Sequence, residues 1–175
     1  ICTISVDITS ITAGTHTNIT EELTYIGANS GSANAGSATA VLNVNTAIAG
    51  FSKAFFHNVQ GPGSITTLTF TIDNSLSGEA ISAVNFIDNL PAGMTIAAPA
   101  NVVSSCGGVL TAPDGGSTIS LTGGAIGLGQ ICTISVDVTS IIAGTHTNTT
   151  GDLTYVGANS GSNVVAGASA DLTVN

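Results

Sequence analysis

The chain contains a near-identical internal repeat. Residues 1–45 align with residues 131–175 at a constant offset of 130 without a gap, and 31 of the 45 positions are identical. Both segments open with Ile-Cys-Thr-Ile-Ser-Val-Asp, at residues 1–7 and 131–137. A fixed period of this kind is the signature of a repeated structural unit. We therefore predict that residues 46–175 are one complete repeat and that residues 1–45 are the C-terminal strands of a preceding, truncated repeat.

Apolar residues in the complete repeat alternate with threonine and serine at a period of two. The runs at 67–72, 119–122, 132–139 and 170–174 all show this alternation. It is typical of antiparallel strands that bury one face and expose the other. Turns rich in glycine, proline and asparagine separate the runs, and no segment keeps a helical period. The pattern predicts an all-β fold of immunoglobulin-like β-sandwich repeats in tandem, with a closed barrel as the alternative. An added hairpin around residues 107–122 would account for the length of the repeat.

The truncated repeat predicts association with further copies. Its first strand belongs inside a sandwich, and strands without their partners would expose an apolar face and unpaired backbone groups. We expect either that the chain is a segment of a longer tandem array or that a neighbouring molecule supplies the missing strands. Both alternatives predict a head-to-tail thread in which the partner is another copy.

The charge balance excludes several classes of partner. The chain has one Lys, no Arg and 10 acidic residues, for a formal charge of −9. Nucleic acids and anionic membrane surfaces need clustered cations, so neither is expected as a partner. No apolar stretch approaches the roughly 18–20 residues of a membrane span, so no membrane insertion is expected.

Catalytic motifs are absent from the sequence. It contains no Gly-x-Ser-x-Gly, His-Glu-x-x-His, phosphate-loop or dinucleotide-binding pattern. We expect no enzymatic activity, no catalytic residue and no cofactor. Turn capping is expected for the aspartates that lie at turns and on an exposed strand face, with calcium binding as the alternative. They are Asp73, Asp88, Asp114, Asp137 and Asp152. No metal site is predicted.

The three cysteines predict a disulfide once the repeat is considered. Each repeat is expected to contain two cysteines, which are Cys106 and Cys132 in the complete repeat. Cys2 is the equivalent of Cys132, and we expect its partner to lie outside these residues. We predict a Cys106–Cys132 disulfide, with two buried free thiols as the alternative. A disulfide would indicate an oxidising, extracellular location.

Three further residues are candidate modification sites. Asn18 and Asn148 are repeat-equivalent acceptors in Asn-x-Thr sequons, with an unmodified surface loop as the alternative. Lys53, the only basic residue, lies between phenylalanines. We expect its stem to lie on those aromatic rings and its ammonium group to reach solvent. The alternatives are burial against a carboxylate and an isopeptide bond to an asparagine side chain.

Several segments resemble a known family of surface domains. They are residues 51–55, residues 68–74, the Asp-Asn-Leu-Pro-Ala-Gly-Met turn at 88–94, and the spaced pair Cys106 and Cys132. They resemble the immunoglobulin-like conserved repeat domains, of unassigned function, of large bacterial and archaeal cell-surface proteins. The resemblance covers 46–175 and, by repetition, 1–45. It implies a β-sandwich, tandem arrays and a cell-surface location, and it carries over no catalytic residue.

Two functions from different classes fit these observations. The first is a structural segment of an extracellular filament or surface fibre, which the repeat and the sparse charge favour. The alternative is an adhesin or a glycan-binding module. Glycan binding usually needs exposed aromatic residues, but each repeat has one tyrosine, at the equivalent positions Tyr25 and Tyr155, and no tryptophan.

Overall fold

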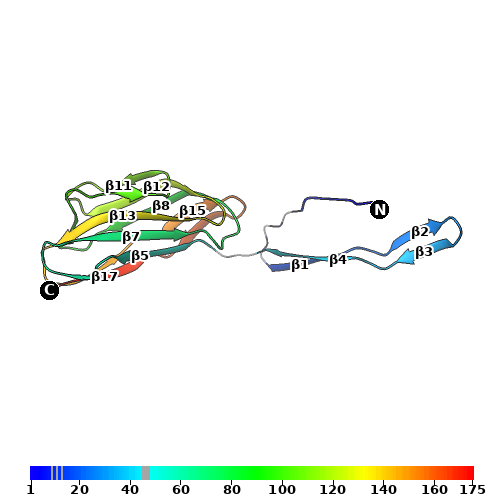
Figure 1. Cartoon of the computed structure of the whole chain (residues 1–175), viewed down its shortest axis with the longest axis horizontal. Coiled ribbons are helices and arrows are strands. Elements are labelled where there is room, and N and C mark those ends of the chain that lie inside the picture. The colour runs from blue at the N-terminus through cyan, green and yellow to red at the C-terminus, as the bar shows by residue number, and fades with distance from the viewer. Residues whose placement is uncertain (9, 11, 13, 45–47) are drawn as a thin grey trace. The chain divides into compact units, whose positions relative to one another are not determined.

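The chain forms two compact units. A computed structural model describes residues 1–8, 10, 12, 14–44 and 48–175, and it divides the chain into unit 1, Ile1–Thr46, and unit 2, Ala47–Asn175. Every regular element in the described residues is a β-strand (Figure 1). Those residues contain no helix that is long and apolar enough to cross a membrane.

Two five-stranded sheets form the body of unit 2. The first contains β5 (Gly50–Phe55), β7 (Ile65–Asp73), β9 (Met94–Ile96), β10 (Val103–Ser104) and β13 (Ile131–Ser140). The second contains β8 (Ile81–Asn89), β11 (Val109–Thr111), β12 (Thr118–Ile126), β15 (Leu153–Gly157) and β16 (Gly161–Val165). Every pairing within these two sheets is antiparallel. The β11–β12 hairpin lies where the sequence indicated an added hairpin.

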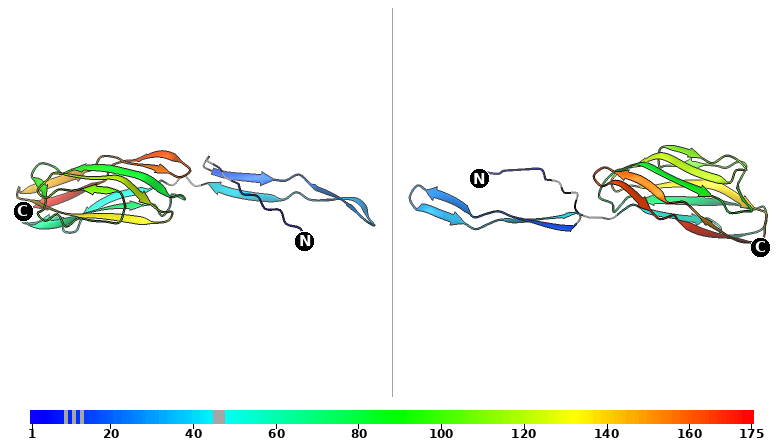
Figure 2. Two further views of the ribbon diagram at one scale, coloured as in Figure 1. Left: turned by 90° about the horizontal axis from the view of Figure 1, so that it is seen from above. Right: turned by 180° about the vertical axis from the view of Figure 1, so that it is seen from behind.

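The core of unit 2 lies between these two sheets (Figures 1 and 2). Alternate residues of β7 and β13 point into it, as the period of two predicted. In β8 and β12 the alternation is interrupted once, where the register between these two strands shifts. β7 and β13 contribute from the first sheet, and β8 and β12 from the second; their fully buried side chains include Phe70, Ile134, Val84 and Ile119. The predicted all-β immunoglobulin-like sandwich is thereby confirmed for unit 2, and no barrel closes around the core.

A third sheet of three strands lies beside β5 (Figure 1). It contains β6 (Val59–Gln60), β14 (Gly144–Thr149) and β17 (Ser169–Val174). β17 pairs with β14 in antiparallel and with β6 in parallel. β14 and β17 turn His146, Asn148, Leu172 and Val174 inward. The body of the sandwich therefore gains both apolar and polar side chains from this sheet.

Unit 1 contains two antiparallel strand pairs. They are β1 (Gly14–Ile19) with β4 (Thr39–Val44) and β2 (Leu23–Gly27) with β3 (Gly31–Ala35). These pairs repeat the pairing of β14 with β17 and of β15 with β16. Gly14 faces Val44 as Gly144 faces Val174. The repeated sequence therefore specifies the same local pairing in both units.

Candidate assembly surface

The two units share their strand pairing but differ in what those strands bury. Leu153 and Tyr155 of β15 are 0% and 3% exposed in unit 2, whereas their equivalents in β2, Leu23 and Tyr25, are 64% and 50% exposed. In unit 2, the Tyr155 hydroxyl also accepts a hydrogen bond of 3.1 Å from the backbone N–H of Ala49. The side chains of β2 whose equivalents fill the core of unit 2 are therefore exposed in unit 1.

The segment before β1 differs in the same way. Ile134 and Val136 of β13 are fully buried in unit 2, whereas their equivalents Ile4 and Val6 are 89% and 75% exposed. β13 pairs with β7 from Ile131 to Thr139, and residues 1–8 belong to no strand. Burying an exposed side chain of this size stabilises by about 1.5–3 kcal/mol. Unit 1 therefore exposes apolar side chains whose equivalents are core residues of unit 2.

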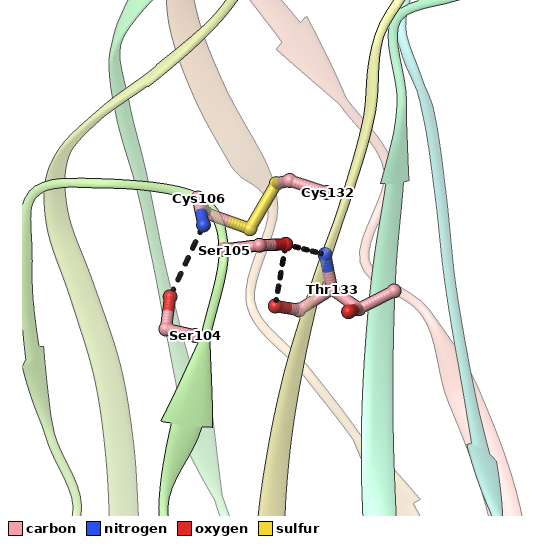
Figure 3. Close-up of a disulfide and its surroundings, with 5 residues drawn as sticks. All are labelled: Ser104, Ser105, Cys106, Cys132 and Thr133. Atoms are coloured by element: carbon pink, nitrogen blue, oxygen red, sulfur yellow. Dashed lines mark hydrogen bonds between the residues drawn. A yellow bond between two sulfur atoms is a disulfide. The ribbon is translucent and has the colours of Figure 1, made fainter.

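A disulfide joins the two cysteines of unit 2 (Figure 3). Cys106 and Cys132 are bonded across 26 residues, and both are buried. Hydrogen bonds hold the segment before Cys106 against β13: the Ser105 hydroxyl donates to the Thr133 carbonyl at 3.3 Å and accepts from its N–H at 2.9 Å. The disulfide therefore links this segment covalently to β13 of the first sheet. Cys2, the repeat equivalent of Cys132, is an exposed free thiol.

The two sequon asparagines lie in different surroundings. Asn18 on β1 is exposed. Asn148 on β14 is completely buried and donates a 2.7 Å hydrogen bond to an Asp88 carboxylate oxygen. A glycan attached at Asn148 would have to occupy the core, so the folded unit has no room for the modification that the sequon suggested there.

Lys53 does not reach solvent, so the expected surface position is wrong. Its ammonium nitrogen lies 3.0 Å from an Asp88 carboxylate oxygen, and both side chains are fully buried. The cause lies in the strand pattern: Phe51, Lys53 and Phe55 of β5 all point inward. Asp88 is buried on the inward face of β8, which corrects the expectation for this aspartate. Asp73 does cap its turn, because its Oδ1 accepts a 2.9 Å hydrogen bond from the Ser75 N–H.

The structure gives little support to a ligand site. In the described ranges no three His, Cys, Asp or Glu side chains gather where a metal ion could bind. A shallow surface hollow in unit 1 is lined by Tyr25, Thr24, Ile26 and Ser32. The residue equivalent to Tyr25 in unit 2, Tyr155, is a core residue.

The facing sheets define unit 2 as an immunoglobulin-like β-sandwich module. The chain belongs to a family described as a domain of unknown function (DUF7933), whose model matches residues 49–174. Among solved structures, it is similar to a cohesin module from a family 33 glycoside hydrolase of Clostridium perfringens ATCC13124, with 12% identity, a TM-score of 0.53, and coverage of 73% of this chain and 98% of that one. It is also similar to a non-cellulosomal cohesin from Archaeoglobus fulgidus, with 16% identity, a TM-score of 0.51, and coverage of 71% and 91%. At these identities the likeness concerns the fold. No curated protein matches the chain.

Proposed function

We propose that this chain is a structural segment of an extracellular filament or surface fibre made of serially arranged immunoglobulin-like domains, with no catalytic role. The observation that carries the proposal is the contrast between the two units. The same strand sequences that fill the core of unit 2 leave Ile4, Leu23 and Tyr25 exposed in unit 1. Association that covers these residues, with strands from a longer chain or from a neighbouring copy, would produce one sandwich after another.

Near-identical repeats favour a structural role over a binding role. Each junction between neighbouring copies would have the same geometry, and the stability of a serial array is roughly a sum of unit and junction terms. The disulfide between Cys106 and Cys132 supports an oxidising location outside the cytoplasm. The sparse charge of the chain, with one Lys and 10 acidic residues, supports self-association over binding to polyanions.

Electron microscopy of surface material from cells that make this protein tests the proposal. We expect threads with an axial repeat on the order of 40–50 Å, from the strand length plus loops. Threads that persist in denaturant would indicate one continuous polypeptide, and release of single chains would indicate strand donation between molecules. Finding the protein inside the cell, or only as separate particles, would contradict the proposed function.

A pair of substitutions on β2 tests the assembly surface directly. Leu23→Asp places a charge where the equivalent Leu153 is buried, whereas Thr24→Asp places it where the equivalent Thr154 is exposed. Sedimentation of both variants should show that the first abolishes association and that the second leaves it unchanged. Equal effects of the two substitutions would argue that this face of β2 is not covered in the assembly.

A further inference from the structure

Three strands of unit 2 bring a lysine, a carboxylate and an amide together inside the core. Lys53 comes from β5, Asp88 from β8 and Asn148 from β14, and each occupies an inward-facing position of its strand. The two oxygens of Asp88 are shared between the other two residues: Oδ1 lies 3.0 Å from Lys53 Nζ, and Oδ2 accepts a 2.7 Å hydrogen bond from Asn148 Nδ2. One carboxylate therefore contacts both an amine and a primary amide.

Packing alone does not explain this cluster. A buried ion pair is weak evidence for stability, because apolar side chains of similar volume often stabilise a core as well or better. The Asn148 carbonyl oxygen is also buried without a hydrogen-bond partner, an arrangement that destabilises a fold and is rare in native cores. A chain with one lysine has placed that residue in its core beside an unsatisfied amide, which indicates a chemical role.

We propose that Lys53 and Asn148 react to form an intramolecular isopeptide bond. The amine nitrogen of Lys53 attacks the side-chain carbonyl carbon of Asn148, a C–N bond forms, and the C–NH2 bond of the amide breaks. One ammonia leaves, so that an amine and a primary amide give a secondary amide plus ammonia, and no oxidant, reductant or other co-reactant is needed. The reaction is independent of whether the chain assembles.

Asp88 is placed to carry the protons of this reaction. Lys53 must lose a proton before its nitrogen can attack, and Asp88 Oδ1 is in direct contact with that nitrogen. The departing amide nitrogen must gain a proton, and it already donates a hydrogen bond to Asp88 Oδ2. Asp88 therefore acts as general base toward the amine and as general acid toward the leaving group. The Lys53 ammonium gives up two protons in all, and both leave with the departing nitrogen as ammonium, so Asp88 ends the reaction in its starting form.

The surroundings of Lys53 favour the neutral amine that the attack requires. Burial lowers the pKa of Lys53 below its usual value of 10.5, against the opposing effects of the Asp88 charge and hydrogen bond. The ring of Phe70 lies 5.8 Å from Nζ and covers that side of the amine, but its face attracts the ammonium form, so burial is the effect that favours the neutral amine. A desolvated lysine beside a proton acceptor is an activated nucleophile.

Trypsin and mass spectrometry of the wild-type chain decide the proposal. Lys53 is the only residue at which trypsin can cut, and a lysine held in an amide is not recognised. The reduced, denatured wild-type protein should resist trypsin completely, and its intact mass should be about 17 Da below that of its sequence, the mass of one ammonia. Cleavage into residues 1–53 and 54–175, with no missing mass, would overturn the proposal.

Variants assign the roles of the three residues. Asn148→Ala and Asp88→Asn should both give a chain of full mass that trypsin cuts once when denatured. Asn89→Ala is the matched control: Asn89 neighbours Asp88 on β8 but is exposed, so this variant should keep the bond and the resistance. Circular dichroism shows which variants fold. A folded Asp88→Asn variant that loses ammonia as fast as the wild type would refute the role of Asp88 as proton carrier.

Discussion

The repeat allows one substitution to be made at two equivalent positions with different expected results. Leu153 is fully buried in unit 2, and Leu23 is 64% exposed in unit 1. Leu153→Ala removes core contacts and leaves a cavity, which typically costs 2–5 kcal/mol, and we take about 3 kcal/mol as the central value. For a domain of about 130 residues, that corresponds to a fall in Tm of about 10 °C. Leu23→Ala should change the stability of the dissociated chain by less than about 0.5 kcal/mol, as an exposed substitution does.

The two variants should behave alike only in the assembled state. If β2 takes the place of β15 in a completed sandwich, Leu23→Ala weakens each junction by a similar amount, about 3 kcal/mol, which raises the critical concentration for assembly about 100-fold. Thermal unfolding followed by circular dichroism at low concentration gives the first comparison, and sedimentation across a concentration series gives the second. The reasoning is refuted if Leu23→Ala lowers the Tm of the dissociated chain as much as Leu153→Ala does, or if assembly is indifferent to it.

Three other predictions follow from unit 2. Replacing Cys106 and Cys132 by serine should lower the free energy of unfolding by about 3.5 kcal/mol, from the chain entropy of the 26-residue loop, and urea titration measures it; an unchanged midpoint would contradict that estimate. Burial raises the pKa of Glu79, but hydrogen bonds from the Ser160 hydroxyl and from two backbone N–H groups outweigh it and hold the pKa below 4.5. The contribution of ionised Glu79 to the free energy of unfolding should therefore be complete above pH 4.5 and be lost as the pH falls through the lower pKa of the folded state. Glu79→Gln should remove this pH dependence from the unfolding free energy. Gly108→Ala should destabilise more than Gly115→Ala in thermal unfolding, because both have positive φ but only at Gly108 would a Cβ meet backbone atoms closer than 3 Å.

The sequence predicted the sandwich because its strands are patterned by burial. The alternation at 67–72 and 132–139 predicted one buried face per strand, and the structure places those faces in the core. The same alternation contained the signal for Lys53, since it shares a period of two with Phe51 and Phe55; the usual preference of lysine for the surface concealed it. Its partners could not be predicted, because Asp88 and Asn148 are separated from each other by 60 residues and meet only through the three-dimensional fold.

The path of the chain through unit 2 has a mechanical consequence. The start of unit 2 lies at the end of β7, because Gly50 pairs with the last residue of that strand. The C-terminal strand ends near the start of β7: Val174 pairs with Gln60, and the Gln60 side chain donates a hydrogen bond to the carbonyl of Ser64, the residue before β7. The chain thus enters at one end of the sandwich and leaves at the other (Figure 1). A force that pulls these two points apart runs along the parallel β6–β17 pair. The backbone bonds there would be sheared together instead of being peeled one by one, so we expect the module to resist stretching along its long axis better than a sideways pull.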